Sequence, residues 1–400
     1  MDDLHGVRMV GPLGPYARGF AAELARLGFT RGSAQKQMGL AAHLSRWLCD
    51  VGLGVADLAT PVVGGFLVAR RAAYRDLLTA KALVPLLGYL RGLGVVPQPG
   101  SPVPQTVVAV LLERYRGWLL TERGLGVKVA RGYVDLVGPF VAAHAVGGEA
   151  GLRELGTGDV TAFMIAESRR LAPRTVQRLA SALRSLLRLW HVQGLIGGPL
   201  DQAVPKVANR RPGLVQPLQP SQIAALMASC DQATAAGRRD LAMLTLLARM
   251  GLRAGEVAGL GLDDINWRRG EITIRGKGNR LDALPLPADA GEALASYLQD
   301  GRPATALDRS VFTRIRAPHQ GLTPGGVTQA VAAAARRAGL GVVYAHRLRH
   351  SAATSMLAEG SSLAEIGQVL RHRRLHTTAA YTKVDIAALR ALARPWPGVS

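Results

Sequence analysis

Cysteine, lysine and aromatic residues are all scarce in this 400-residue chain, which holds two cysteines, six lysines and 5% aromatic residues. Cys49 and Cys230 lie far apart in sequence, which excludes a disulfide framework and predicts two reduced thiols. No apolar run approaches the roughly 20 residues that a membrane-spanning helix needs. Asp2 and Asp3 begin a mixed N-terminal stretch that does not resemble a signal peptide. We therefore expect a soluble, cytoplasmic protein.

Acidic residues are also in short supply, because 28 acidic side chains stand against 49 basic ones and leave a net charge of +21. The imbalance covers the whole chain: residues 1–212 hold 26 basic and 14 acidic side chains, and residues 213–400 hold 23 and 14. Positive charge over every part of a protein favours a polyanionic partner, since bound phosphates release their counterions. The alternative is an arginine-rich genome, and composition alone does not choose between the two explanations.

The chain is long enough for two or three domains, and its 48% hydrophobic content allows each to bury a core. Abundant alanine, leucine and arginine favour helix. The front half repeats a series of features at an offset that drifts from 96 to 100 residues. The matched features include Gly28 and Gly124, Phe66 and Phe163, Arg70-Arg71 and Arg169-Arg170, Leu86-Leu87 and Leu186-Leu187, and Gly94 and Gly194. This order predicts two copies of one small helical module, at residues 1–100 and 101–205.

The second module contains an amphipathic helix between Arg174 and Trp190. Its apolar stripe comprises Val176, Leu179, Leu183, Leu186, Leu187 and Trp190, and its opposite face comprises Arg174, Arg178, Ser181, Ser185 and Arg188. Such a face is usually only solvated, but three arginines without an acid favour contact with phosphates. A proline-rich linker at residues 206–220 follows and carries Lys206, Arg210 and Arg211, which we expect to lie across DNA.

The last third of the chain holds six polar residues in one order: Arg253, Lys277, His346, Arg349, His372 and Tyr381. Arg253 and Glu256 are expected to begin a helix, one turn apart. Lys277 is expected at the tip of a β-hairpin formed by residues 271–275 and 282–286, with Arg275 and Arg280 beside it. Ordinary alternatives exist: Arg253 could simply pair with Glu256, Lys277 could be a solvated charge, and Tyr381 could be a core aromatic residue.

Two histidine pairs at a spacing of four residues, His346 with His350 and His372 with His376, match the spacing of metal ligands on a helix. No glutamate follows either leading histidine, and arginines, which repel a divalent cation, crowd both pairs. The alternative is a clamp in which the guanidinium groups of Arg253 and Arg349 hold a phosphate. His346 and His372 would then bind the same phosphate or move protons. This second interpretation predicts no metal and no cofactor.

Together these residues resemble the tyrosine recombinase (phage-integrase) family over roughly residues 215 to 390, and Ser351-Ala352-Ala353-Thr354 continues the family pattern. The resemblance implies a mainly α fold: two small helical, SAM-like DNA-binding domains precede a mixed α+β catalytic domain with a small antiparallel sheet. It implies an N-terminal domain at 1–100, a core-binding domain at 101–205, a linker at 206–220 and a catalytic domain at 221–400. In family terms Glu256 supports the site and Lys277 protonates the departing 5′-hydroxyl.

The resemblance also assigns Tyr381 as the nucleophile of a site-specific recombinase that forms a 3′-phosphotyrosyl intermediate without metal or ATP. One departure concerns the residue before His372, where the family usually has glycine and this chain has Arg371. With Arg373 after it, Arg371 could crowd the site or add phosphate contacts.

The implied partner is double-stranded DNA at recombination sites, bound by a homotetramer whose subunits are monomers or weak oligomers when free. Ile386, Leu389, Leu392 and Ala393 form a short apolar stripe suited to docking on a neighbour or on the same domain. We expect an integrase of a mobile element, associated with a bacterial nucleoid, and leave the need for accessory proteins open. The alternatives are a type IB topoisomerase and a non-catalytic DNA-binding factor.

Overall fold

The computed structural model describes residues 6–98, 106–207, 216–276 and 281–371. The chain divides into two compact units, Gly100–Pro212 on the one hand and Met1–Pro99 together with Gly213–Ser400 on the other. Three large and separate hydrophobic cores lie within residues 13–96, 111–204 and 218–348. Among the described residues, no helix is both long and apolar enough to cross a bilayer.

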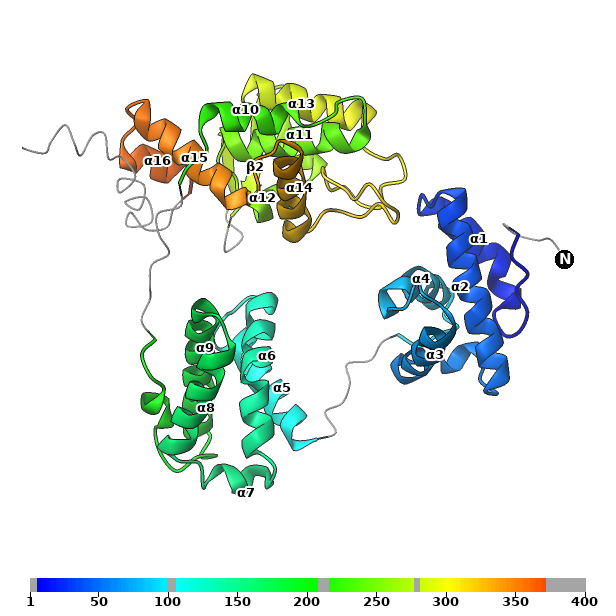
Figure 1. Cartoon of the computed structure of the whole chain (residues 1–400), viewed down its shortest axis with the longest axis vertical. Coiled ribbons are helices and arrows are strands. Elements are labelled where there is room, and N and C mark those ends of the chain that lie inside the picture. The colour runs from blue at the N-terminus through cyan, green and yellow to red at the C-terminus, as the bar shows by residue number, and fades with distance from the viewer. Residues whose placement is uncertain (1–5, 99–105, 208–215, 277–280, 372–400) are drawn as a thin grey trace, which may run out of the picture. The chain divides into compact units, whose positions relative to one another are not determined.

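The first core lies among helices (Figure 1). They are α1 (Ala17–Arg26), α2 (Arg31–Asp50), α3 (Thr60–Ala73) and α4 (Val84–Gly92), with short 3-10 turns at Gly14–Tyr16, Val55–Asp57 and Ala80–Leu83. Thr30 caps α2 by accepting a hydrogen bond from the Ser33 backbone N–H. Phe20, Phe66 and Leu90 are fully buried at the centre of this core.

The second core is helical as well. Its elements are α5 (Val107–Thr121), α6 (Val127–His144), α7 (Gly148–Leu152), α8 (Thr157–Arg170), α9 (Pro173–Val192) and a 3-10 turn at Leu200–Ala203. The predicted apolar stripe of α9 is buried, with Trp190 at 1% exposure. The prediction that Ser185 lies on the polar face was wrong. Its hydroxyl is buried, bonds the Tyr115 hydroxyl and donates to the Ala182 carbonyl at 2.8 Å.

Both modules place glycines with positive φ at corresponding points. Gly28 (φ 81°) and Gly124 (φ 56°) follow the first helix of each module, and Gly94 (φ 72°) and Gly194 (φ 69°) follow the last. A left-handed residue directly after a helix favours glycine, because other side chains are strained there. These are the glycines that the sequence repeat pairs, which supports the proposal that the first module is a copy of the second.

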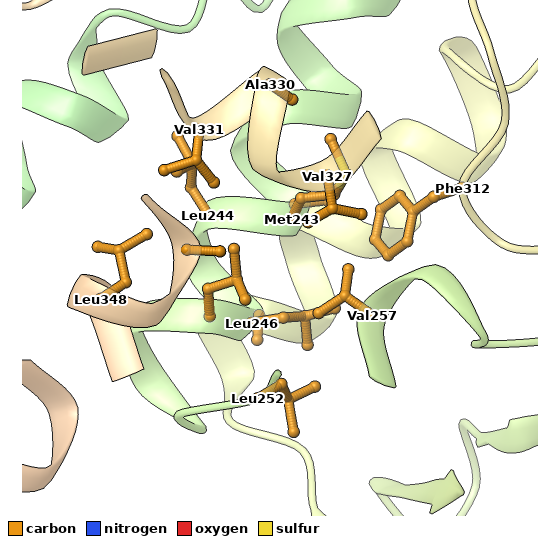
Figure 2. Close-up of a cluster of buried hydrophobic side chains, with 14 of the residues drawn as sticks. Met243, Leu244, Leu246, Leu252, Val257, Phe312, Val327, Ala330, Val331 and Leu348 are labelled. Atoms are coloured by element: carbon orange, nitrogen blue, oxygen red, sulfur yellow. The ribbon is translucent and has the colours of Figure 1, made fainter. Parts of the chain in front are cut away.

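The third core combines helices with a small sheet. Its helices are α10 (Pro220–Ala228), α11 (Ala235–Arg249), α12 (Ala254–Ala258), α13 (Ala288–Asp300), α14 (Pro324–Arg337) and α15 (Ala345–Ala358), with a 3-10 turn at Leu262–Asp264. Helix α16 (Leu363–Val369) follows and packs with α15 in a smaller separate cluster. Figure 2 shows side chains of α11, α14 and α15 gathered in this core, among them Leu244, Val331 and Leu348.

The sheet contains β1 (Ile265–Asn266), β2 (Glu271–Arg275) and β3 (Leu281–Pro285), all antiparallel in the order β1-β2-β3. Ile272 pairs with Leu284 and Ile274 with Asp282. Both isoleucines are buried while Thr273 between them is not, so the alternation of buried and more exposed residues fixes the register of the hairpin. A mainly helical fold with a small antiparallel sheet was predicted, and the structure confirms it.

Candidate active site

The candidate site is built around the turn between α11 and α12. Gly251 adopts φ +57° there, a left-handed conformation that strains any other residue. It also packs closely against the end of α16, since a Cβ placed on Gly251 would lie 2.5 Å from Leu370 Cδ2. Leu370 is fully buried against Ala353 of α15 and Ile366 of α16. Glycine at this position therefore lets the end of α16 contact the turn that leads into Arg253.

Arg253 is the N-cap residue of α12, which confirms its predicted position at the start of a helix. Its backbone N–H donates to Glu256 Oε2 at 2.8 Å, and its Nη1 donates to Glu256 Oε1 at 2.6 Å. The Arg253 side chain is 43% exposed while that of Glu256 is 5% exposed. The carboxylate thus holds one edge of the guanidinium from inside the protein, and the remaining edge is left towards solvent. Such a group can bind an anion without leaving its anchor.

The Glu256 carboxylate lies in a cationic environment. Burial raises its pKa, but the hydrogen bond from the Arg253 backbone and the charges of Arg371 and Arg253 lower it more, and the net pKa lies below the ordinary value. Glu256 is therefore ionised at neutral pH. Removing either arginine would leave part of a buried negative charge without compensation.

Arg349 of α15 is 1% exposed and points into the protein. Its two terminal nitrogens donate to the carbonyl oxygens of Gly251 and Leu370. One guanidinium thus joins α15, the α11–α12 turn and the end of α16. In this geometry Arg349 stabilises the site by holding these three segments together. The prediction that it also binds the phosphate directly stays a prediction.

His346 and His350 lie one turn apart on α15, and their Nε2 atoms are 2.9 Å apart. Burial, followed by the charges of His346 and Arg349, lowers the pKa of His350 to about 4. His350 is therefore neutral at physiological pH and can share a hydrogen bond with exposed His346. The part of the chain that the structure describes holds no group of three or more His, Cys, Asp or Glu residues placed to bind a metal ion.

Arg371 follows α16 and has φ +54°, one of two non-glycine residues with positive φ among those described. Its side chain is 8% exposed, and its Nη2 donates to Glu256 Oε2 at 2.7 Å. Its Nη1 donates to the Val369 carbonyl at 3.3 Å. The sequence offered no signal for this buried pair, because Arg371 and Glu256 are 115 residues apart.

The predicted DNA-contacting residues differ in their surroundings. Arg174, Arg178 and Lys206 are exposed. Arg188 pairs at 2.9 Å with Asp201, an acid that follows the helix and lies outside the predicted arginine face. Arg275 pairs with Asp264 at 3.0 Å. Seven predicted site residues lie outside the described residues: Arg210, Arg211, Lys277, Arg280, His372, Arg373 and Tyr381.

Comparisons with known proteins place this site in context. The profile of the phage integrase family matches residues 216–387. The protein y4rA of Sinorhizobium fredii, which is named as an integrase/recombinase, is 38% identical to this chain. The match covers 97% of this chain and 95% of y4rA. Tyrosine recombinase XerD of Listeria monocytogenes is 32% identical over 70% of this chain and 96% of its own length.

Two solved structures share the fold. XerH site-specific recombinase bound to its palindromic difH substrate has a TM-score of 0.57 at 18% identity, over 82% of this chain and 93% of that one. A lambda integrase tetramer bound to a Holliday junction has a TM-score of 0.54 at 15% identity, over 82% of this chain and 90% of that one. The sequence relatives, which this chain matches over most of their length, carry the assignment. The chain belongs to the phage integrase family of tyrosine recombinases, whose members cleave and rejoin DNA strands.

Proposed function

We propose that this protein is a site-specific DNA recombinase in which Tyr381 attacks a scissile phosphate held by Arg253. The observation that supports this most is the geometry of Arg253, whose guanidinium is anchored on buried Glu256 and remains 43% exposed. A cation fixed in this way is preorganised for a phosphate oxygen and needs no rearrangement when negative charge develops. His346, exposed on the neighbouring helix α15, supplies a second hydrogen-bonding group to the same phosphate.

The reaction exchanges one phosphodiester for another. The Tyr381 phenol gives its proton to a histidine of the site or to solvent, and its oxygen forms a bond to phosphorus. The bond from phosphorus to the 5′-oxygen breaks, and Lys277 gives that oxygen a proton. A 5′-hydroxyl from the partner strand then attacks the phosphotyrosine and regenerates the phenol. Because the number of phosphoester bonds is conserved, the cycle requires no ATP. Ionising a free tyrosine at pH 7 costs about 4 kcal/mol, which the cations of the site offset by stabilising the phenolate.

DNA contacts outside the site come from the core-binding domain, which we assign to residues 101–205, and from the linker at 206–220. Arg174 and Arg178 stand exposed on α9, the helix whose other face fills the second core. Exposed Lys206 follows, and Arg210, Arg211, Arg280 and Arg373 are proposed to add phosphate contacts. We assign 221–400 as the catalytic domain and 1–100 as an added N-terminal domain. These side chains would contact the sugar–phosphate backbone of the DNA, so they supply affinity and orientation more than sequence preference.

Assembly into a tetramer on DNA is proposed from a cavity of about 660 Å³ in the catalytic domain, whose lining mixes apolar side chains with Arg249, Asp289 and Glu359. Its lining includes Ile223 and Met227 of α10, Ala248 of α11 and Met356 of α15. We propose that the apolar stripe of Ile386, Leu389, Leu392 and Ala393 from a second copy docks on the apolar part of this lining. Lambda integrase, which shares the fold, has been solved as a tetramer bound to a Holliday junction, and this supports a tetramer on DNA. Such a protein would act on the bacterial nucleoid, as an integrase of a mobile element.

The test is formation of a covalent protein–DNA complex by the full-length chain. The substrate is a library of nicked duplexes of random sequence, incubated in EDTA so that divalent metals cannot contribute. We expect denaturation-resistant adducts for the wild type and none for Tyr381→Phe, with DNA binding retained in both. Adducts that persist in Tyr381→Phe would overturn the proposal. With the captured sequence in hand, strand transfer between two labelled duplexes separates a recombinase from a topoisomerase, which would only relax a supercoiled plasmid.

A further inference from the structure

Residue 371 occupies a backbone conformation that suits glycine, yet it is an arginine. Its φ of +54° lies in the left-handed region, where a side chain meets steric strain. The residue stands directly before the segment 372–400, which carries His372 and Tyr381. A strained residue persists only where its surroundings compensate for it. The surroundings of Arg371 should therefore show what the side chain does.

The compensation is a buried ion pair. The Arg371 side chain is 8% exposed and that of Glu256 is 5% exposed, with 2.7 Å between Nη2 and Oε2. The Val369 carbonyl accepts from Nη1, while the buried Nε has no partner among the residues that the structure describes. Removing one partner of an ion pair this deeply buried strongly destabilises the folded protein, because the other charge is left buried without compensation. Arg371 and Glu256 are therefore coupled to each other.

The same carboxylate holds Arg253. Oε1 accepts from Arg253 Nη1, and Oε2 accepts from both the Arg253 backbone and Arg371. Glu256 thus connects the start of α12 to the start of the segment that carries Tyr381. It also carries one negative charge against two guanidinium groups. The positive charge of Arg253 is consequently not cancelled by its anchor, and the site keeps a net positive charge for the phosphate.

Such an arginine could bind the phosphate itself, or it could hold in position the groups that bind the phosphate. We call the second role a brace. Its burial and its bond to Glu256 favour the brace, since a phosphate ligand needs an accessible nitrogen. We propose that Arg371 is a positioning residue for strand cleavage, which fixes the start of the Tyr381 segment to the carboxylate that orients Arg253. This inference rests on the function proposed above for Tyr381. Glycine at residue 371 would leave the Arg253–Glu256 pair in place but leave this connection out.

The experiment compares Arg371→Gly, Arg371→Asn and Arg371→Lys in the full-length protein. Glycine and asparagine both tolerate a left-handed backbone, so a loss common to both reports the missing cation and not backbone strain. We expect the single-turnover rate of covalent complex formation on the captured DNA to fall by about ten- to a hundredfold, the range for a slightly displaced reacting group. Lysine should recover part of the rate, and a lysine variant no faster than the asparagine variant would count against the ion pair.

Salt dependence distinguishes a brace from a phosphate ligand. For a brace, the slope of log K against log salt concentration should match the wild type in all three variants. A slope shallower by about 0.9 would mean that Arg371 itself neutralises a phosphate, and the proposal would be wrong. Wild-type cleavage rates in the glycine and asparagine variants would overturn it as well.

Hydrogen exchange of the DNA-free protein tests the brace independently of cleavage. Arg371→Gly, Glu256→Gln and the double variant should each increase exchange in α12 and α16, with the double variant no worse than the more severe single one. Strictly additive effects would show that the two residues are not coupled and would refute the proposal. If coupling is found but the wild type forms no covalent complex, the brace stands and the proposed function fails.

Discussion

Replacing Gly251 by alanine tests how the turn before Arg253 is built. A left-handed alanine costs about 1–2 kcal/mol relative to glycine. The added methyl would also lie 2.5 Å from Leu370 Cδ2, inside a fully buried cluster. Overpacking of this kind costs about 1–3 kcal/mol, because neighbouring side chains must move. Together we expect Gly251→Ala to lower the free energy of opening of this region by about 2–5 kcal/mol.

Gly339→Ala is the matched control. Gly339 has φ +69° and no atom within 4 Å of the position its Cβ would take. It therefore carries the backbone strain alone, about 1–2 kcal/mol. Hydrogen exchange of peptides from α11, α15 and α16 in the full-length protein measures the difference locally, which avoids treating a chain of several domains as one cooperative unit. Equal protection in the two variants would refute the claim that Leu370 packs against this turn.

The functional consequence of Gly251→Ala follows from the same contacts. Displacing Leu370 moves one of the two carbonyls that Arg349 binds, and straining Gly251 moves the other. We therefore expect cleavage to fall along with local protection, while Gly339→Ala keeps the wild-type rate. A Gly251→Ala variant with lowered protection and full activity would contradict the view that Arg349 shapes the site through these carbonyls.

Two further predictions concern charge. The pKa of His350 is lowered from 6.5 to about 4, so between these pH values the unfolded chain binds more protons than the native state. A shift of this size corresponds to about 3.4 kcal/mol, which we reduce to about 2 kcal/mol because the side chain is partly exposed and screened by solvent. The native state should lose this stability as pH falls through the window, and His350→Gln should remove the loss in urea titrations. A pH dependence unchanged by His350→Gln would exclude this residue as its source. On DNA, Arg178→Ala should make the salt slope shallower by about 0.9, whereas Arg188→Ala should change it less because Arg188 already pairs with Asp201. The reverse order would show that Arg188 is the closer phosphate contact.

Local patterns in the sequence predicted local structure well. The hairpin followed from two short β-type runs on either side of the Gly276-Lys277-Gly278-Asn279 tip, and the helix start at Arg253 followed from Gly251 and from Glu256 three residues on. The apolar stripe of α9 was equally clear, because six large side chains recur at helical spacing. In each case the signal lies within a few residues of the structure it specifies.

Contacts over long sequence separations escaped prediction. The Ser185 hydroxyl is satisfied by Tyr115, 70 residues away, so a serine on the edge of the polar face could turn inward. The phosphate contact predicted for Arg349 stays a prediction, but its hydrogen bonds to carbonyls 98 and 21 residues away had no signal in the sequence. A one-dimensional pattern shows that a charge is present. It does not show which group, brought close only by folding, will neutralise it.

The most direct test of the central claim is to identify the residue that DNA becomes attached to. The trapped covalent complex of the full-length protein can be digested with nuclease and protease, and the modified peptide sequenced by mass spectrometry. The account predicts a nucleotide joined through its 3′-phosphate to Tyr381, with a free 5′-hydroxyl on the released strand. A nucleotide on any other side chain, or a link through a 5′-phosphate, would contradict it.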